Sequence, residues 1–227
     1  GRVSFWGDVS GHTNNAWQTN EAQRPSLVTN LWKGLPGLRF DGSNDMLVIS
    51  NSPLLNIGGP YSNKMIAIAF RTGADVQSRQ VLYEQGGTNC GLCVYIQYGN
   101  ILMCGWNLTN SAWGPAWTYA PVGRNEQLTV QLVLHDNVVE GFVDTDSLGT
   151  VTAGLLYGES DGIGIGGIRG ATRFHDGDIG TEGQYSLRGT IFEIVDPSYM
   201  GYVGVIGAYM ANLWSGNFAA TAATAAG

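Results

Sequence analysis

One stretch of the chain, rich in aromatic and small polar residues, has the composition of a sugar-binding site. Residues 105–119 contain three tryptophans and a tyrosine among asparagine, serine, threonine, glycine and proline, and we expect them to form a loop. Aromatic faces stack on the C–H faces of sugars, while amides and hydroxyls bond the sugar hydroxyl groups. The candidate ligand-binding residues are Trp106, Asn107, Trp113, Trp117 and Tyr119. The alternative is that these rings fill or cap the core, because tryptophan is highly buried on average.

Two sets of carboxylates have a spacing that bears on glycoside hydrolysis. That reaction needs two carboxyl groups about 5–10 Å apart, one protonated and one ionised. Glu140, Asp144 and Asp146 have even spacing, but the strand that carries them runs into a turn. Glu159 and Asp161 lie in a turn flanked by glycines. Neither set has the pattern of a catalytic pair, and we predict that the protein is not an enzyme.

The histidines and cysteines form no motif of a catalytic or zinc site. The three histidines, which have no evident partners in the sequence, are His12, His135 and His175. Cys90 and Cys93 have CxxC spacing, but no second pair follows. We expect Cys93 and Cys104 to face each other across a hairpin, as either one disulfide or two buried free thiols.

Acidic turns suggest one cofactor, Ca²⁺, which takes six to eight oxygen ligands from carboxylates and carbonyls. The two turns are Asp144-Thr145-Asp146 and residues 173–178, Arg-Phe-His-Asp-Gly-Asp. Aspartate and glycine are also common in ordinary turns. We therefore assign no ligands to a calcium ion.

The overall composition favours many short strands. Charged residues are only 13% of the chain and glycines number 34, whereas exposed helices need lysine and glutamate on their outer faces. The net charge of −7, with no cluster of lysine and arginine, argues against a nucleic-acid partner. No run of about 18 apolar residues is present, so the sequence predicts no membrane-spanning helix.

Hydrophobic patterning predicts about ten short strands and one helix. Residues 92–98 and 101–105 form the clearest hairpin, with Gly99-Asn100 as its two-residue turn. The other main strands are expected at residues 64–71, 80–84, 127–134, 138–143, 163–168 and 187–195. A helix is expected from Tyr199 to Trp214, because apolar residues recur there at three- and four-residue spacing. Residues 1–33 are expected to form an irregular loop.

Residues 34–50 predict a turn, a strand, a second turn and a second strand. Pro36 and Gly37 mark the first turn, since proline fixes φ and glycine accepts unusual φ values. We expect the Asp41–Asp45 turn to close a hairpin whose Phe40 and Leu47 side chains point inward.

Three motifs along the chain resemble the concanavalin A-like lectin/glucanase superfamily in its bacterial laminin-G-like form. They are residues 6–11, Trp-Gly-Asp-Val-Ser-Gly, followed by residues 23–28; residues 37–45, Gly-Leu-Arg-Phe-Asp-Gly-Ser-Asn-Asp; and residues 189–194 with 207–211 and Trp214. The resemblance implies a jelly-roll of two antiparallel sheets. The superfamily includes sugar-binding modules, protein-binding adhesion domains and glycoside-cleaving enzymes, so the fold does not determine the function. The Glu-x-Asp-x-x-Glu strand motif of its hydrolases has no match here.

We therefore predict an all-β, two-sheet antiparallel jelly-roll sandwich with one C-terminal helix. Residues 1–215 are expected to form one domain and residues 216–227 a flexible tail or linker. The predicted function is that of a non-catalytic, extracellular or cell-surface module that binds carbohydrate or a surface glycoconjugate within a larger protein. The alternative is a protein-binding or structural fibre-tip domain of laminin-G type, which could be oligomeric. A glycan-cleaving enzyme is the third possibility.

Overall fold

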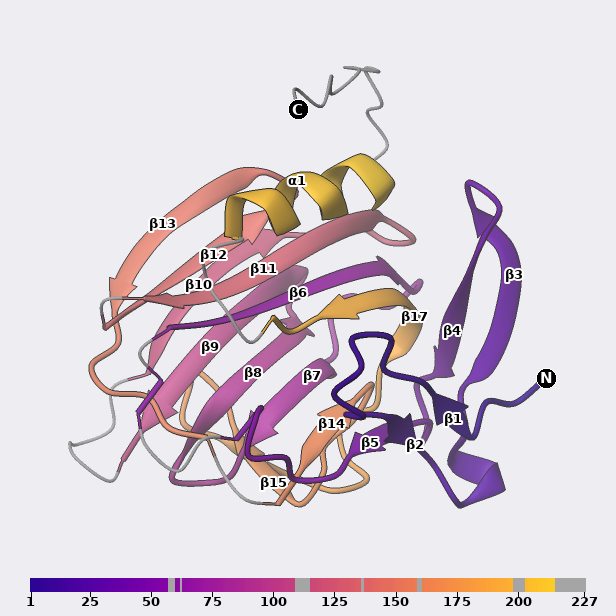
Figure 1. Ribbon diagram of the computed structural model, residues 1–227, viewed down its shortest axis with the longest axis horizontal. Helices are drawn as coiled ribbons and strands as arrows, with labels where there is room; N and C mark the ends of the chain where they lie inside the picture. The colour runs from indigo at the N-terminus through magenta and orange to yellow at the C-terminus, as the bar shows by residue number, and fades with distance from the viewer. Residues whose placement is uncertain are drawn as a thin grey trace.

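The computed structural model describes residues 1–56, 60–61, 63–108, 115–135, 137–158, 161–197 and 203–214. Its strands form two large antiparallel sheets that pack face to face as a jelly-roll sandwich, and a helix follows them (Figure 1). The predicted fold class is therefore confirmed. Among the described residues, no helix is long and apolar enough to cross a membrane.

The two sheets have eight and seven strands. In spatial order, the larger sheet contains β1 (Phe5–Trp6), β2 (Ala16–Trp17), β5 (Leu47–Ile49), β14 (Ile163–Ile165), β7 (Gln80–Gly86), β8 (Cys90–Gln97), β9 (Asn100–Asn107) and β10 (Ala116–Pro121). The smaller sheet contains β13 (Asp146–Thr152), β12 (Val138–Val143), β11 (Gln127–His135), β6 (Asn63–Thr72), β17 (Arg188–Val195), β4 (Leu35–Asp41) and β3 (Ser26–Trp32). A two-stranded ribbon pairs β15 (Ala171–Arg173) with β16 (Ile179–Thr181), and a 3-10 turn, η1, spans Glu21–Gln23.

Side chains of the central strands are buried on both faces. In β6, Ile66, Ile68 and Phe70 point into the sandwich interior, whereas Met65 and Ala67 belong to a separate apolar cluster on the outer face. This alternation follows from the period of two in a β-strand. Burial of both faces explains why these strands read as nearly continuous apolar runs rather than as alternating ones.

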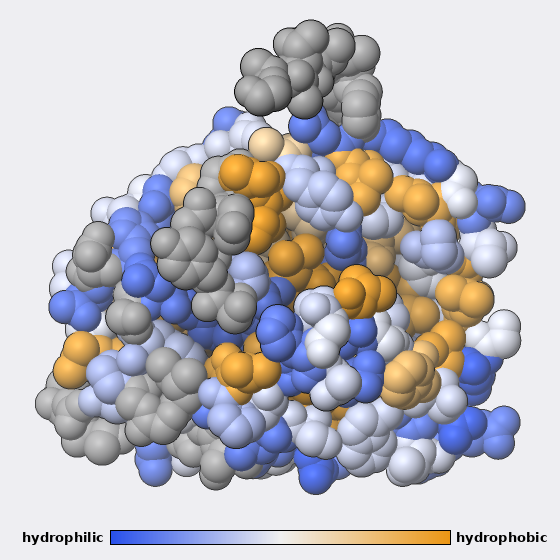
Figure 2. All heavy atoms as spheres, viewed as in Figure 1, coloured by the Kyte–Doolittle hydropathy of each residue, from blue (hydrophilic) through white to orange (hydrophobic). Residues whose placement is uncertain are grey.

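Two elements cover the outer faces. Helix α1 (Val203–Trp214) places Met210 and Trp214 on the outer face of the seven-stranded sheet. Ile168 and Phe174, which lie before and after β15, cover the outer face of the eight-stranded sheet. The face drawn in Figure 2 is hydrophilic along much of its rim, and hydrophobic side chains gather near its centre, below the helix.

The β8–β9 hairpin is confirmed, but its turn lies one residue earlier than predicted. Tyr98 and Gly99 have φ values of 51° and 72°, as a type I′ turn requires, and the Asn100 side chain donates a hydrogen bond to the Tyr98 carbonyl. Cys93 lies opposite Cys104, as expected. These two cysteines and Cys90 are buried, and none of the three forms a disulfide.

The Asp41–Asp45 turn does not close a hairpin, so that prediction was wrong. Strand β4 before it and β5 after it lie in different sheets, and the turn is a corner where the chain crosses the sandwich. Phe40 and Leu47 do point into the core, as predicted. The corner fails as a hairpin because each flanking strand has its own partners, β17 and β3 for β4, and β14 and β2 for β5.

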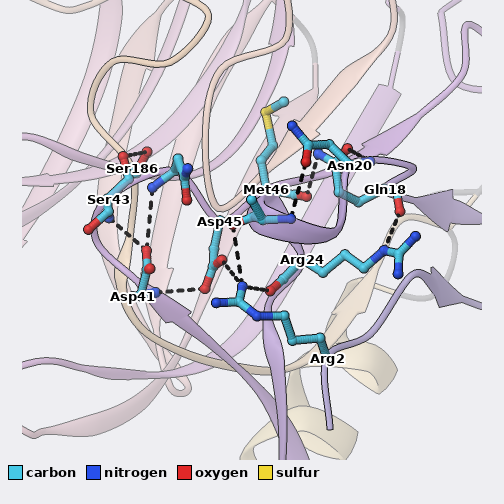
Figure 3. Close-up of polar contacts among 11 residues, drawn as sticks. Arg2, Gln18, Asn20, Arg24, Asp41, Ser43, Asp45, Met46 and Ser186 are labelled. Carbon is cyan, nitrogen blue, oxygen red and sulfur yellow. Dashed lines mark hydrogen bonds and ion pairs between the residues drawn. The ribbon is translucent and has the colours of Figure 1, made fainter.

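A buried carboxylate holds the corner to the N-terminal segment (Figure 3). Asp45 accepts hydrogen bonds from the Arg2 guanidinium at 3.1 Å and from the Asp41 backbone N–H at 3.0 Å. Next to it, Gln18 donates to the Met46 carbonyl at 3.1 Å. Burial raises the pKa of Asp45, and its neighbour Asp41 adds to that effect.

Residues 1–33 are more regular than expected. They contain β1, β2, η1 and β3, of which β2 pairs with β5 and β3 pairs with β4. Strands of two residues have no period that a sequence pattern can detect, and their hydrogen bonds come from distant partners. The predicted helix is present from Val203, while its predicted start at Tyr199 and the predicted tail at 216–227 lie outside the described residues.

A buried glutamate on β7 gives the fold a pH-dependent stability. Glu84 is fully buried, its Oε1 accepts a 2.7 Å hydrogen bond from the Arg169 N–H, and its Oε2 has no partner among the described residues. Burial raises its pKa well above the ordinary value of 4.5. The unfolded chain ionises this group near pH 4.5 whereas the folded chain keeps the proton, so stability falls as the pH rises from there towards the folded pKa.

We expect Glu84→Gln to remove this fall, because the amide keeps an oxygen acceptor and cannot ionise. The measurement is urea unfolding at several pH values between 4 and 8. Glu21→Gln is the control, since Glu21 is exposed and its substitution should leave the profile unchanged. A Glu84→Gln profile as steep as the wild-type profile would contradict the assignment.

Candidate ligand-binding site

Both described ends of the aromatic segment at 105–119 are strands rather than the loop that we expected. Residues 105–107 complete β9, and residues 116–119 belong to β10, which pairs with it from Ala116 opposite Gly105 onwards. Trp113 lies in residues 109–114, outside the described part of the chain. Trp106, Trp117 and Tyr119 therefore occupy sheet positions, where the direction of each side chain is fixed by the pleat.

Trp106 is a core residue rather than an exposed aromatic face. Its side chain is fully buried in the cluster on the outer face of the eight-stranded sheet, and its Nε1 donates to the Gly87 carbonyl at 3.1 Å. Asn107 is half-buried at the end of β9, and its side-chain amide donates to the Leu155 carbonyl at 2.6 Å. Trp106 is therefore not the exposed aromatic face that we expected, whereas ligand binding by Asn107 stays a prediction.

Trp117 and Tyr119 do lie together on an accessible surface. Both point outward from β10, because Thr118 between them points into the sandwich towards Gly141. Their ring centroids are 5.4 Å apart with an angle of 33° between the planes. Trp117 is partly exposed, and Tyr119 is 55% exposed. Of the predicted residues that the structure describes, these two form an accessible pair.

A histidine that the sequence analysis did not select extends this aromatic pair. The His175 ring lies 4.5 Å from the Trp117 ring, between centroids. It is fixed by Tyr95, whose hydroxyl bonds His175 Nδ1 and accepts the His175 backbone N–H at 3.1 Å. We call Trp117, Tyr119 and His175 the aromatic ledge. His175 lies in the segment between β15 and β16. It is far from Trp117 and Tyr119 in sequence, so the sequence pattern could not group the three.

Arg79 holds that segment against the sheet. Its guanidinium packs 4.1 Å from the centre of the Phe174 ring and bonds the carboxylates of Asp176 and Asp178. The Arg79 side chain is itself nearly buried, so these charged hydrogen bonds are less screened than bonds on the surface. The position of His175 beside Trp117 therefore depends on the ion pairs that Asp176 and Asp178, its neighbours in sequence, form with Arg79.

The ledge has the groups that a sugar ring needs. Trp117 and Tyr119 offer aromatic faces, and the partly exposed Asp176 and exposed Asp178 carboxylates beside His175 can accept hydrogen bonds from hydroxyl groups. Burial lowers the pKa of His175 below its ordinary value of 6.5, so its ring is neutral at pH 7. A neutral imidazole can both donate and accept a hydrogen bond.

The acidic turns that suggested Ca²⁺ have other partners. Asp176 and Asp178 bond Arg79, and Asp144 accepts hydrogen bonds from the backbone N–H and the hydroxyl of Thr129 at 3.0 and 3.1 Å. Within the part of the chain that the structure describes, no three His, Cys, Asp or Glu side chains are grouped as metal ligands. Calcium binding stays a prediction.

Two of the carboxylates considered for hydrolysis, Glu140 and Asp144, bond other residues of the fold. Glu140 bonds His135 Nε2 at 3.1 Å and the Ser147 hydroxyl at 2.6 Å. Asp144, in a turn with φ of 52°, secures Thr129 on the neighbouring strand. Glu159 of the second set lies outside the described residues.

No protein-family model and no curated protein matches the chain. Among solved structures, it is similar to the binding domain of botulinum neurotoxin serotype G, with a TM-score of 0.60 and 7% identity over 93% of this chain and 50% of that one. The ligand-binding domain of serotype D, solved with N-acetylneuraminic acid, gives 0.54 and 9% over 91% and 50%. Domains LG4-5 of the mouse laminin α1 chain match with 0.46 and 18% over 62% and 38%.

The chain thus spans about half the length of these toxin domains. At such low identities the likeness establishes the fold alone. The chain has a jelly-roll sandwich fold of the kind found in the toxin binding domains.

Proposed function

We propose that this chain is a non-catalytic module that binds carbohydrate or a glycoconjugate through the aromatic ledge. The observation that carries the proposal is the side-by-side placement of Trp117 and Tyr119 on an accessible strand, with His175 against Trp117. Rings fixed in this way lose little conformational entropy when a ligand stacks on them, because the sheet and the Tyr95 hydroxyl already hold them.

Two further observations support a binding role over a catalytic one. The ligand-binding domain of serotype D, half of which this chain matches in fold, was solved with N-acetylneuraminic acid. In this chain, Glu140 and Asp144 are engaged by the fold, and Glu84 is too deeply buried to meet a substrate. We place the binding unit in residues 1–215, acting outside the cell as part of a larger protein.

The proposal is tested by screening the purified chain on a glycan array and measuring the affinity of the best glycan by calorimetry. We expect Trp117→Ala and Tyr119→Ala each to weaken binding about tenfold, because each removes one stacking face. Trp17→Ala is the matched control: Trp17 is also a partly exposed aromatic residue of the same sheet, at the opposite end from β10. A correctly folded chain that binds no glycan would contradict the proposal.

The geometry of the ledge makes a prediction that needs no ligand. We expect the His175 ring to titrate below pH 6.5 in an NMR titration, because burial disfavours its charged form. Trp117→Ala uncovers the ring and should raise this pKa, whereas Trp17→Ala should not change it. A wild-type midpoint at or above 6.5 would show that the ledge is not packed as described, independently of any glycan.

A further inference from the structure

A site that shares no residue with the aromatic ledge lies elsewhere on the molecule. A cleft of about 650 Å³ opens between the N-terminal segment, the end of β17 and the last turns of α1. Leu35, Leu55 and Ile165 contribute apolar walls, and Tyr209 and Trp214 border it from the helix. The hydrophobic patch below the helix in Figure 2 lies on this face. The cleft is large enough to enclose several side chains of a partner.

The cleft exists because two neighbouring strands separate. Strands β17 and β4 pair only from Arg188 opposite Asp41 to Ile191 opposite Leu38. A bulge at Phe192 interrupts the other edge of β17, beyond which the strand continues to pair with β6 through Val195. The N-terminal part of β4 pairs with β3 instead. Figure 1 shows β4 and β3 leaning away from β17 and β6 at this point.

One backbone edge of β17 is consequently open. Residues 193–195 pair with β6 on one side, and among the described residues no backbone hydrogen bond reaches their opposite side. Residues 192–197 all line the cleft. An unpaired strand edge presents alternating N–H and C=O groups with the repeat of a β-strand, and an extended polypeptide satisfies that repeat. A sugar or a compact apolar molecule does not.

The charge of the cleft sets a second requirement for the molecule that binds there. Its lining includes the carboxylates of Asp8, Glu193 and Asp196, and no lysine or arginine is among the described lining residues. Lys64 lies behind Asp196 and neutralises it at 2.8 Å. Among the described residues, the donors to Glu193 are neutral: the Tyr209 hydroxyl at 3.0 Å and the Trp214 indole N–H at 2.6 Å. Two negative charges are left for an occupant to balance.

We propose that this cleft binds an extended segment of a partner protein, which adds as a strand to the open edge of β17. Apolar side chains at alternate positions of the segment enter the walls, and a lysine or arginine meets Asp8 and Glu193. This site is separate from the aromatic ledge and does not depend on glycan binding. It gives specific support to the protein-binding alternative.

The test selects random ten-residue peptides, displayed on phage, against the immobilised full chain, and then measures synthetic copies by fluorescence anisotropy. We expect enriched peptides to alternate apolar residues and to carry lysine or arginine. Methylating alternate backbone nitrogens should weaken binding about tenfold or more for one of the two sets of alternate nitrogens, because only one set faces β17. Binding should also weaken as the salt concentration rises.

Two variants locate the site. Leu54 lines the cleft and is 52% exposed, so Leu54→Arg adds bulk and positive charge there without disturbing the core. We expect it to weaken peptide binding about tenfold, with unchanged circular dichroism and melting temperature. Leu155→Arg is the matched control, since Leu155 is similarly exposed and is not among the lining residues. The control should bind like the wild type.

Three results would overturn the proposal. The first is a selection that enriches no peptide over background. The second is peptide binding that survives both Leu54→Arg and every backbone methylation, which would mean that the peptides bind elsewhere. The third is enrichment only of uncharged sequences similar to residues 215–227, which follow Trp214 at the border of the cleft and would then be its occupant. Glycan binding measured in parallel reports on the ledge alone.

Discussion

The central strands β6, β8 and β9 carry apolar side chains on both faces, so the interior of the sandwich can bury only half of them. Each fully buried large side chain is worth about 1.5–3 kcal/mol, and the outer halves are therefore too costly to leave in water. The chain meets this constraint with two covers. The helix lies over the seven-stranded sheet, and the segment around β15 lies over the eight-stranded sheet.

Both candidate sites form at the borders of these covers. The segment that buries Phe174 over the larger sheet also carries His175 to the edge of the cover, where Trp117 is half exposed. The helix that buries Met210 over the smaller sheet ends with Trp214, which stacks on Phe192 at 5.1 Å and borders the cleft. The two sites share no lining residue, so one molecule can bind a ligand at each of them.

The sequence predicted those parts of the fold that depend on local pattern. The strands β6, β8, β11 and β12 were found because their runs of apolar residues are long, and the type I′ turn was placed within one residue. The crossing at Asp41–Asp45 was misread, because a tight turn looks the same whether its strands pair with each other or with distant partners.

The candidate site was predictable only in part, for the same reason. Trp106 and Trp117 occur in one aromatic segment. Residues 168–174 cover Trp106, whose indole N–H bonds the Gly87 carbonyl, whereas Trp117 stays accessible. His175 reaches the ledge through contacts of Arg79 and Tyr95, about 80 to 100 residues away in sequence. Composition identifies an aromatic surface in general, but register and long-range packing decide which rings belong to it.

The buried thiols have a practical consequence. Cys90, Cys93 and Cys104 are all buried, and burial raises the pKa values of Cys93 and Cys104 above that of a free thiol. Thiol reagents attack the thiolate, so Cys93 and Cys104 are nearly inert to them, and Cys90 is shielded by its burial. A single cysteine introduced on the surface becomes the one reactive position. The protein can thus carry a fluorophore, a spin label or a surface attachment at a chosen point without removal of its own cysteines.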